Sequence, residues 1–135
     1  MNTKTTGTCR VAAIFLLAAG LWGCTGEPPQ LTLDDLTPQE RTFIERYVVI
    51  ERARAVALAD PPLGQALLDS LGAAWGDSAN AETKRLLPGD PARLAAVNRL
   101  LSRVLASEED SLVMAPRADR LAAPLTEPPK APPPP

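Results

Sequence analysis

Apolar residues recur every three or four positions in several stretches between residues 37 and 113, which is the spacing of helices with one buried side. The longest stretch runs from Thr37 to about Ala59. Its first residues, Thr37-Pro38-Gln39-Glu40, are typical of a capping box with proline in the first turn. Its buried side is expected to carry Phe43, Tyr47, Ile50 and Ala57, flanked by Ile44, Val48 and Ala55. Its exposed side is expected to carry Arg41, Glu45 and Arg52.

A second helix is predicted from about Pro62 to Trp75, after a stop at Asp60-Pro61-Pro62. Four of its residues recur every four positions and form a leucine ridge: Leu63, Leu67, Leu71 and Trp75. We expect this ridge to be core, and the alternative is that it is a partner-binding surface. Interior glycine lowers helix propensity by about 1 kcal/mol relative to alanine. Gly64 and Gly72 therefore predict a close approach to the alanine-rich end of the first helix, which carries Ala53, Ala55, Ala57 and Ala59.

Two further helices are predicted after this hairpin. A short one begins after Asp77 or Ser78 and ends near Leu87, and a longer one runs from Pro91 to about Ser111. The core stripe of the longer helix is expected to be Leu94, Val97, Leu101 and Val104. Its acidic run, Glu108-Glu109-Asp110, is expected to be a solvated helix end that frays, because it opposes the helix dipole. The pattern predicts an all-α fold, either a small three- to four-helix bundle or an orthogonal helical domain.

The segments on either side of this helical domain (residues 37–113) have a different character. Residues 24–36 contain Pro28-Pro29 and are expected to form an extended tether. Residues 114–135 are proline-rich and have no apolar period, so they are expected to be disordered or polyproline II. The alternatives for this tail are a ligand for a proline-binding partner and a spacer in the cell wall.

Residues 1–23 have the organisation of a signal peptide. Lys4 and Arg10 precede an uncharged apolar stretch of about 13 residues, which is too short to cross a bilayer as a stable helix. Such a leader can direct ordinary secretion, or it can be retained as a membrane anchor.

The residues Leu21-Trp22-Gly23-Cys24 resemble the lipobox of bacterial lipoproteins: leucine, a variable position, glycine and the lipidated cysteine. The resemblance implies that Cys24 becomes the first residue of the mature protein and anchors it through acyl chains such as palmitate. Trp22 departs from the smaller residue that is usual there. In Gram-negative bacteria, Thr25 rather than aspartate after the cysteine implies the outer membrane. The long first helix and the Asp90-Pro91 start of the last helix also resemble small helical lipoproteins of unknown function.

Charge and composition narrow the chemistry that is open to this chain. The formal net charge is −2, and loss of Lys4 and Arg10 with the leader would make the protein more acidic, which disfavours binding to nucleic acid. The chain has no histidine, the commonest general base and metal ligand. Cys9 would leave with the leader and Cys24 would carry lipid, so no thiol would remain. We therefore assign no catalytic residue, no metal ligand and no cofactor.

These observations favour a lipid-anchored cell-envelope protein whose helical domain is an interaction or structural module. Its partners would be the membrane, through the lipid on Cys24, and an envelope protein or a second copy of itself. One alternative is a carrier with a cavity for a small apolar ligand. Another is an envelope hydrolase that uses paired carboxylates.

Overall fold

A computed structural model describes residues 30–76 and 79–130. Within those two ranges the protein is entirely helical and contains no strand, so the all-α prediction is confirmed. The four α-helices are α1 (Pro38–Ala59), α2 (Pro61–Trp75), α3 (Ala79–Lys84) and α4 (Pro91–Val113). Two 3₁₀ turns, η1 (Leu33–Asp35) and η2 (Ala118–Arg120), lie before α1 and after α4.

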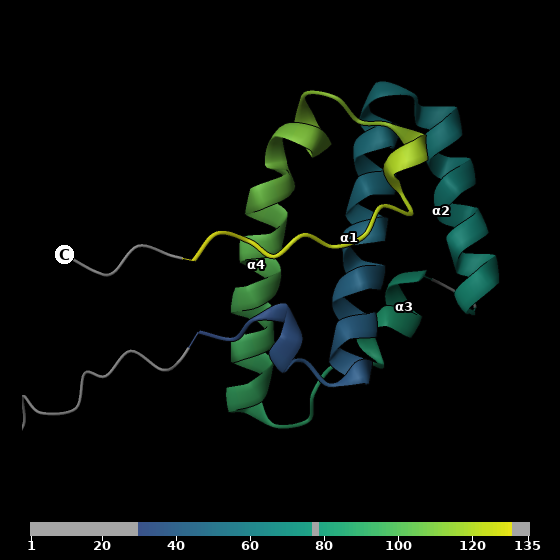
Figure 1. Cartoon of the computed structure of the whole chain (residues 1–135). Coiled ribbons are helices and arrows are strands. Elements are labelled where there is room, and N and C mark those ends of the chain that lie inside the picture. The colour runs from purple at the N-terminus through teal and green to yellow at the C-terminus, as the bar shows by residue number, and fades with distance from the viewer. Residues whose placement is uncertain (1–29, 77–78, 131–135) are drawn as a thin grey trace, which may run out of the picture.

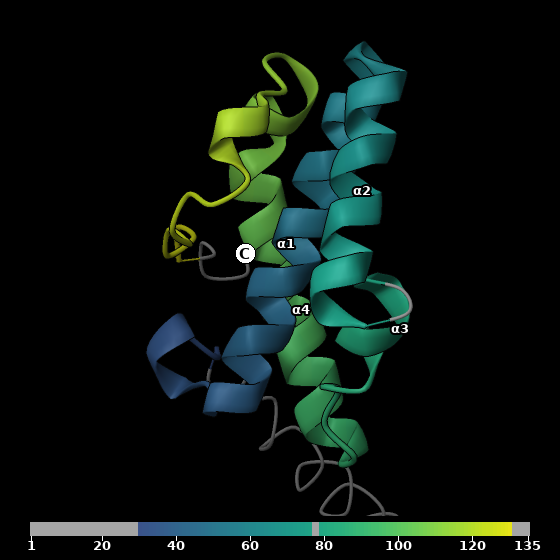
Figure 2. The ribbon, with the colours of Figure 1, turned by 90° about the vertical axis from the view of Figure 1, so that its right-hand side faces the viewer.

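Helix α1 lies at the centre of the domain, with α4 on one side and α2 on the other (Figure 1). The chain runs in the same direction along α1 and α4, and in the opposite direction along α2 (Figures 1 and 2). Because α1 and α4 are parallel, α2 has to carry the chain back along α1 before α4 can begin. The short helix α3 packs against α1 and α2 where this return ends.

The three long helices begin in the same way, with a polar cap followed by proline. The side chains of Thr37, Asp60 and Asp90 accept backbone N–H bonds from the residues three positions later, and Thr37 also forms the predicted capping box with Glu40. Helix α2 starts at Pro61, one residue earlier than expected, because Asp60 both ends α1 and caps α2. Helix α3 ends at Lys84 rather than near Leu87, and its expected caps, Asp77 and Ser78, lie outside the described residues.

The main core lies between the parallel helices α1 and α4. It contains Leu33, Phe43, Ile44, Val48, Val97, Leu100, Leu101 and Val104. Three of the four residues of the predicted α4 stripe are buried, whereas Leu94 is only half-buried. The core is therefore built mostly from the residues that the helical period selects.

Helix α2 approaches α1 through its glycines, as the sequence predicts. A Cβ atom added to Gly64 would lie 2.2 Å from Cα of Ala57, far inside van der Waals contact. Gly64 and Gly72 are the buried residues of α2. The glycine side of α2 thus forms the seam with α1, and the leucine ridge lies beside that seam.

Both ends of the described chain pack onto the α1–α4 core. Leu31 and Leu36, placed in the tether by the sequence, pack against the core, and Leu33 belongs to it. The proline-rich tail was expected to be disordered or polyproline II. Among its described residues, Leu125 packs against the core, and Glu127 Oε2 accepts a hydrogen bond from the Leu33 backbone at 2.9 Å. Composition does not reveal these contacts, because their partners lie far away in the sequence.

Candidate functional site

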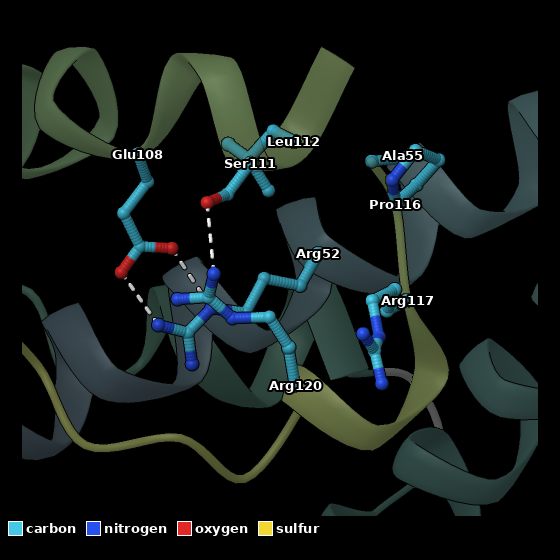
Figure 3. A pocket seen from close by; sticks show the side chains of 8 residues that line it. All are labelled: Arg52, Ala55, Glu108, Ser111, Leu112, Pro116, Arg117 and Arg120. Atoms are coloured by element: carbon cyan, nitrogen blue, oxygen red, sulfur yellow. Dashed lines mark hydrogen bonds and ion pairs between the residues drawn. The ribbon is translucent and has the colours of Figure 1, made fainter. Parts of the chain in front are cut away.

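A buried ion pair joins α1 to α4 near the C-terminal ends of both helices. Arg52 Nε donates to Glu108 Oε2 at 2.8 Å, and Nη2 donates to Oε1 at 2.5 Å, so the contact is bidentate (Figure 3). The two side chains are only 5% and 9% exposed. Charges this far from water are retained only when they are paired and hydrogen-bonded.

Arg52 also holds the C-terminal segment. Its Nη1 donates to the backbone carbonyls of Ala123, at 2.8 Å, and Leu121, at 3.4 Å. One guanidinium therefore fastens three parts of the chain: the helix that carries it, α4 and the segment after η2.

The sequence interpretation of both members of this pair was wrong. Arg52 was expected on the exposed side of the first helix, and Glu108 in a solvated, fraying end, whereas both are buried and α4 continues to Val113. The spacing of the apolar residues around Arg52 could have indicated that this side chain is buried. Arg52 lies four residues after Val48 and four before Val56, and both valines are buried. Glu108 likewise lies four residues after the buried Val104, but its partner is 56 positions away and no local pattern reveals it.

A small pocket lies beside this ion pair. It is lined by Arg52, Ala55, Glu108, Ser111, Leu112, Pro116, Arg117 and Arg120 (Figure 3). Its cavity of about 10 Å³ has room for about one water molecule, far below the roughly 300–1,000 Å³ of small-molecule sites. Arg120 donates to Ser111 Oγ at 2.9 Å, and Arg117 pairs with Asp119 at 2.7 Å. Because both arginines already have these partners, the pocket does not offer a free guanidinium to an anion.

A second ion pair joins the N-terminal ends of α1 and α4. Arg93 Nε and Nη2 each lie 2.7 Å from an oxygen of Glu40, whose Oε2 also accepts the Thr37 backbone N–H at 2.8 Å. The hydrogen bonds from Arg93 lower the pKa of Glu40 from 4.5 to about 2, against the opposing effect of burial. Glu40 is therefore a structural anion and cannot donate a proton as a general acid near neutral pH.

The leucine ridge lies at the margin of the contact between α1 and α2 and not in the core. Leu63 is 42% exposed, and Leu67, Leu71 and Trp75 are half-buried, so the expectation that the ridge is core is wrong. The physical reason is that the glycines occupy the helix contact and push the larger side chains to its margin. Trp75 is partly covered by Arg46, whose guanidinium carbon lies 4.9 Å from the ring centre.

The remaining sequence predictions concern metals, membranes and the lipid site. Within residues 30–76 and 79–130, no cluster of three or more histidine, cysteine, aspartate or glutamate side chains is placed to hold a metal ion. No helix in these ranges has the length and hydropathy to cross a membrane. Cys24 and the signal peptide lie outside the described residues. Comparison of the chain with protein-family models, curated proteins and solved structures finds no match.

Breaking the buried pair is expected to destabilise the domain strongly. Arg52→Met should lower the free energy of unfolding by about 3–5 kcal/mol, because Glu108 is left charged and buried without a partner. The matched control is Arg54→Met, since Arg54 forms an exposed pair with Glu51 on the same helix and should cost at most about 1 kcal/mol. Urea unfolding followed by circular dichroism measures both variants. Equal effects for the two would contradict a buried pair.

The second ion pair is expected to make stability depend on pH in the acid range. A carboxyl whose pKa is lower in the folded state than in the unfolded state stabilises the fold above the unfolded value, and this contribution is lost as the pH falls toward the folded value. The stability difference between the protein and Glu40→Gln, about 1–3 kcal/mol at pH 7, should therefore shrink as the pH falls from 4.5 to about 2. A difference that stays constant over this range would exclude the pair with Arg93 as its cause.

Proposed function

We propose that this protein is a lipid-anchored component of a bacterial cell envelope, whose helical domain acts as an interaction or structural module. The observation that carries the proposal is Leu21-Trp22-Gly23-Cys24 at the end of a short apolar leader. Two acyl chains hold a protein stably at a membrane, whereas one holds it only marginally. Thr25 after the cysteine favours the outer membrane in a Gram-negative cell.

The first described residues are bound to α4, so only a short tether separates Cys24 from the domain. Arg103 of α4 binds the side chain of Gln30 at 3.3 Å and also the backbone carbonyl of Leu31. The tether between Cys24 and Gln30 can span at most about 20 Å, at roughly 3.3 Å per residue. A lipid on Cys24 would thus keep the body of the domain close to the membrane surface.

The faces of the domain suggest how such a module would be used. The described chain enters and leaves beside α4, whereas α2 lies on the other side of α1 (Figures 1 and 2). The leucine ridge of α2 is the surface that we propose for an envelope protein, or for a second copy of the chain. Catalysis is not part of the proposal, because Glu40 and Glu108 are engaged by arginines.

Replacement of Cys24 tests the anchor directly. Cys24→Ala should move the protein from the membrane fraction to the wash, because the lipid has lost its attachment point. Cys9→Ala is the matched control, since Cys9 lies within the leader and should leave fractionation unchanged. Mass spectrometry of the mature N-terminus measures the diacylglyceryl group. Membrane retention of Cys24→Ala, or a mature Cys24 without lipid, would contradict the proposal.

A further inference from the structure

The large apolar side chains that the described residues leave exposed gather at one end of the domain. They are Leu58, at 87% exposure, Leu63, at 42%, Val113, at 67%, and Met114, at 80%. Leu58 and Leu63 flank the turn from α1 to α2, whereas Val113 and Met114 end α4, and both chain reversals lie at the same end of the helices (Figures 1 and 2). Ala55 and Pro116 line one pocket, so the end of α1 lies against the loop after α4. Because Leu63 also belongs to the leucine ridge, we define the apolar tip as the other three residues, Leu58, Val113 and Met114.

The chain segments that form the tip carry little charge. Residues 112–116 carry no charge, and between Leu58 and Leu63 the single charged residue is Asp60, whose carboxylate caps α2. The opposite end carries the Glu40–Arg93 pair and the cap Asp90. Exposed apolar side chains gathered in one place commonly mark a contact surface. Charged side chains also lie at the tip end of the domain, but Arg52 is buried with Glu108, and Arg117 is paired with Asp119.

We propose that the apolar tip docks on the lipid bilayer that holds Cys24, with its side chains in the interfacial region. This inference rests on the lipid anchor of the proposed function. The tether joins the body where Arg103 binds Gln30, and Val113 lies about 15 Å further along α4, at roughly 1.5 Å per residue. A tether of at most about 20 Å spans this offset, so the acyl chains and the tip can reach the same membrane together.

A bilayer suits this surface better than a protein does. The tip consists of three side chains at the C-terminal ends of α1 and α4, whereas a stable protein interface takes about 20–30 residues from each side. A lipid anchor raises the effective concentration of the membrane at the tip, so a small apolar contact is enough to orient the domain. Arg117 and Arg120 follow the tip in the sequence, but they are bound to Asp119 and Ser111, so the contact should not weaken as salt is raised.

Fluorescent labels on the intact lipoprotein test this docking. Met114→Cys places a thiol at the tip, and Ala92→Cys places one at the other end of the same helix as a matched control. Cys9 leaves with the leader and lipid blocks Cys24, so each mature protein carries one reactive thiol. In vesicles of phosphatidylethanolamine and phosphatidylglycerol, an environment-sensitive dye at residue 114 should shift to the blue. Nitroxide-labelled phospholipids should quench it at low and high salt, whereas a dye at residue 92 should be unaffected. Leu58→Cys should repeat the result from the C-terminal end of α1.

The outcomes separate the docking from the anchor. A protein that floats with the vesicles but shows no lipid quenching at residues 58 and 114 would overturn the docking alone. A blue shift that grows with the density of protein on the vesicles, without quenching by the nitroxide lipid, would mean that the tip contacts a second copy of the chain. That result would also overturn the docking. A protein that does not float, and whose mass lacks the diacylglyceryl group, would overturn the anchor and the docking with it.

Discussion

The parallel pairing of α1 and α4 is the constraint on which the rest of the fold depends. Two ion pairs join the helices, and the acid belongs to α1 in one pair and to α4 in the other. Helix α1 carries Glu40 and then Arg52, and α4 carries Arg93 and then Glu108. In the parallel arrangement each charge meets its opposite, whereas reversing one helix would bring like charges together. Buried charged pairs add little net stability, but a wrong pairing leaves charges unpaired and is costly. The pairs therefore select the direction and register of the helices more than they strengthen the core.

The other elements follow from this constraint. Parallel neighbours need a long return connection, and α2 supplies it by running back along α1 through the Gly64 seam. That contact uses small residues, so the larger side chains of α2 stay at the margin, where a partner can reach them. Meanwhile Arg52 holds the C-terminal segment, and Leu33 and Glu127 join the two ends of the described chain over the core. The partner-facing side and the membrane-facing end of the proposed module are what this arrangement leaves uncovered.

Local chemistry was predictable from the sequence, and long-range pairing was not. Thr37 and Asp90 identify helix starts because a cap acts within three residues, and Val97, Leu101 and Val104 identify a core stripe because burial follows the helical period. Arg52 and Glu108 were assigned to water because their charge was weighed without a partner, which lies 56 residues away. The contacts of the tail could not be predicted for the same reason, since they depend on donors in η1 and α1 that lie far away in the sequence. The leader and Cys24 stay predictions from the sequence.

The buried position of Arg52 is the most direct test of this account. Nuclear magnetic resonance can measure hydrogen exchange at the Arg52 Nε–H, with the exposed Arg99 of α4 as the reference. Because Nε–H donates to Glu108 away from water, its exchange should be much slower than that of Arg99, and Glu108→Gln should accelerate it. Exchange as fast as that of Arg99 would place Arg52 in solvent and contradict the parallel α1–α4 pairing described here.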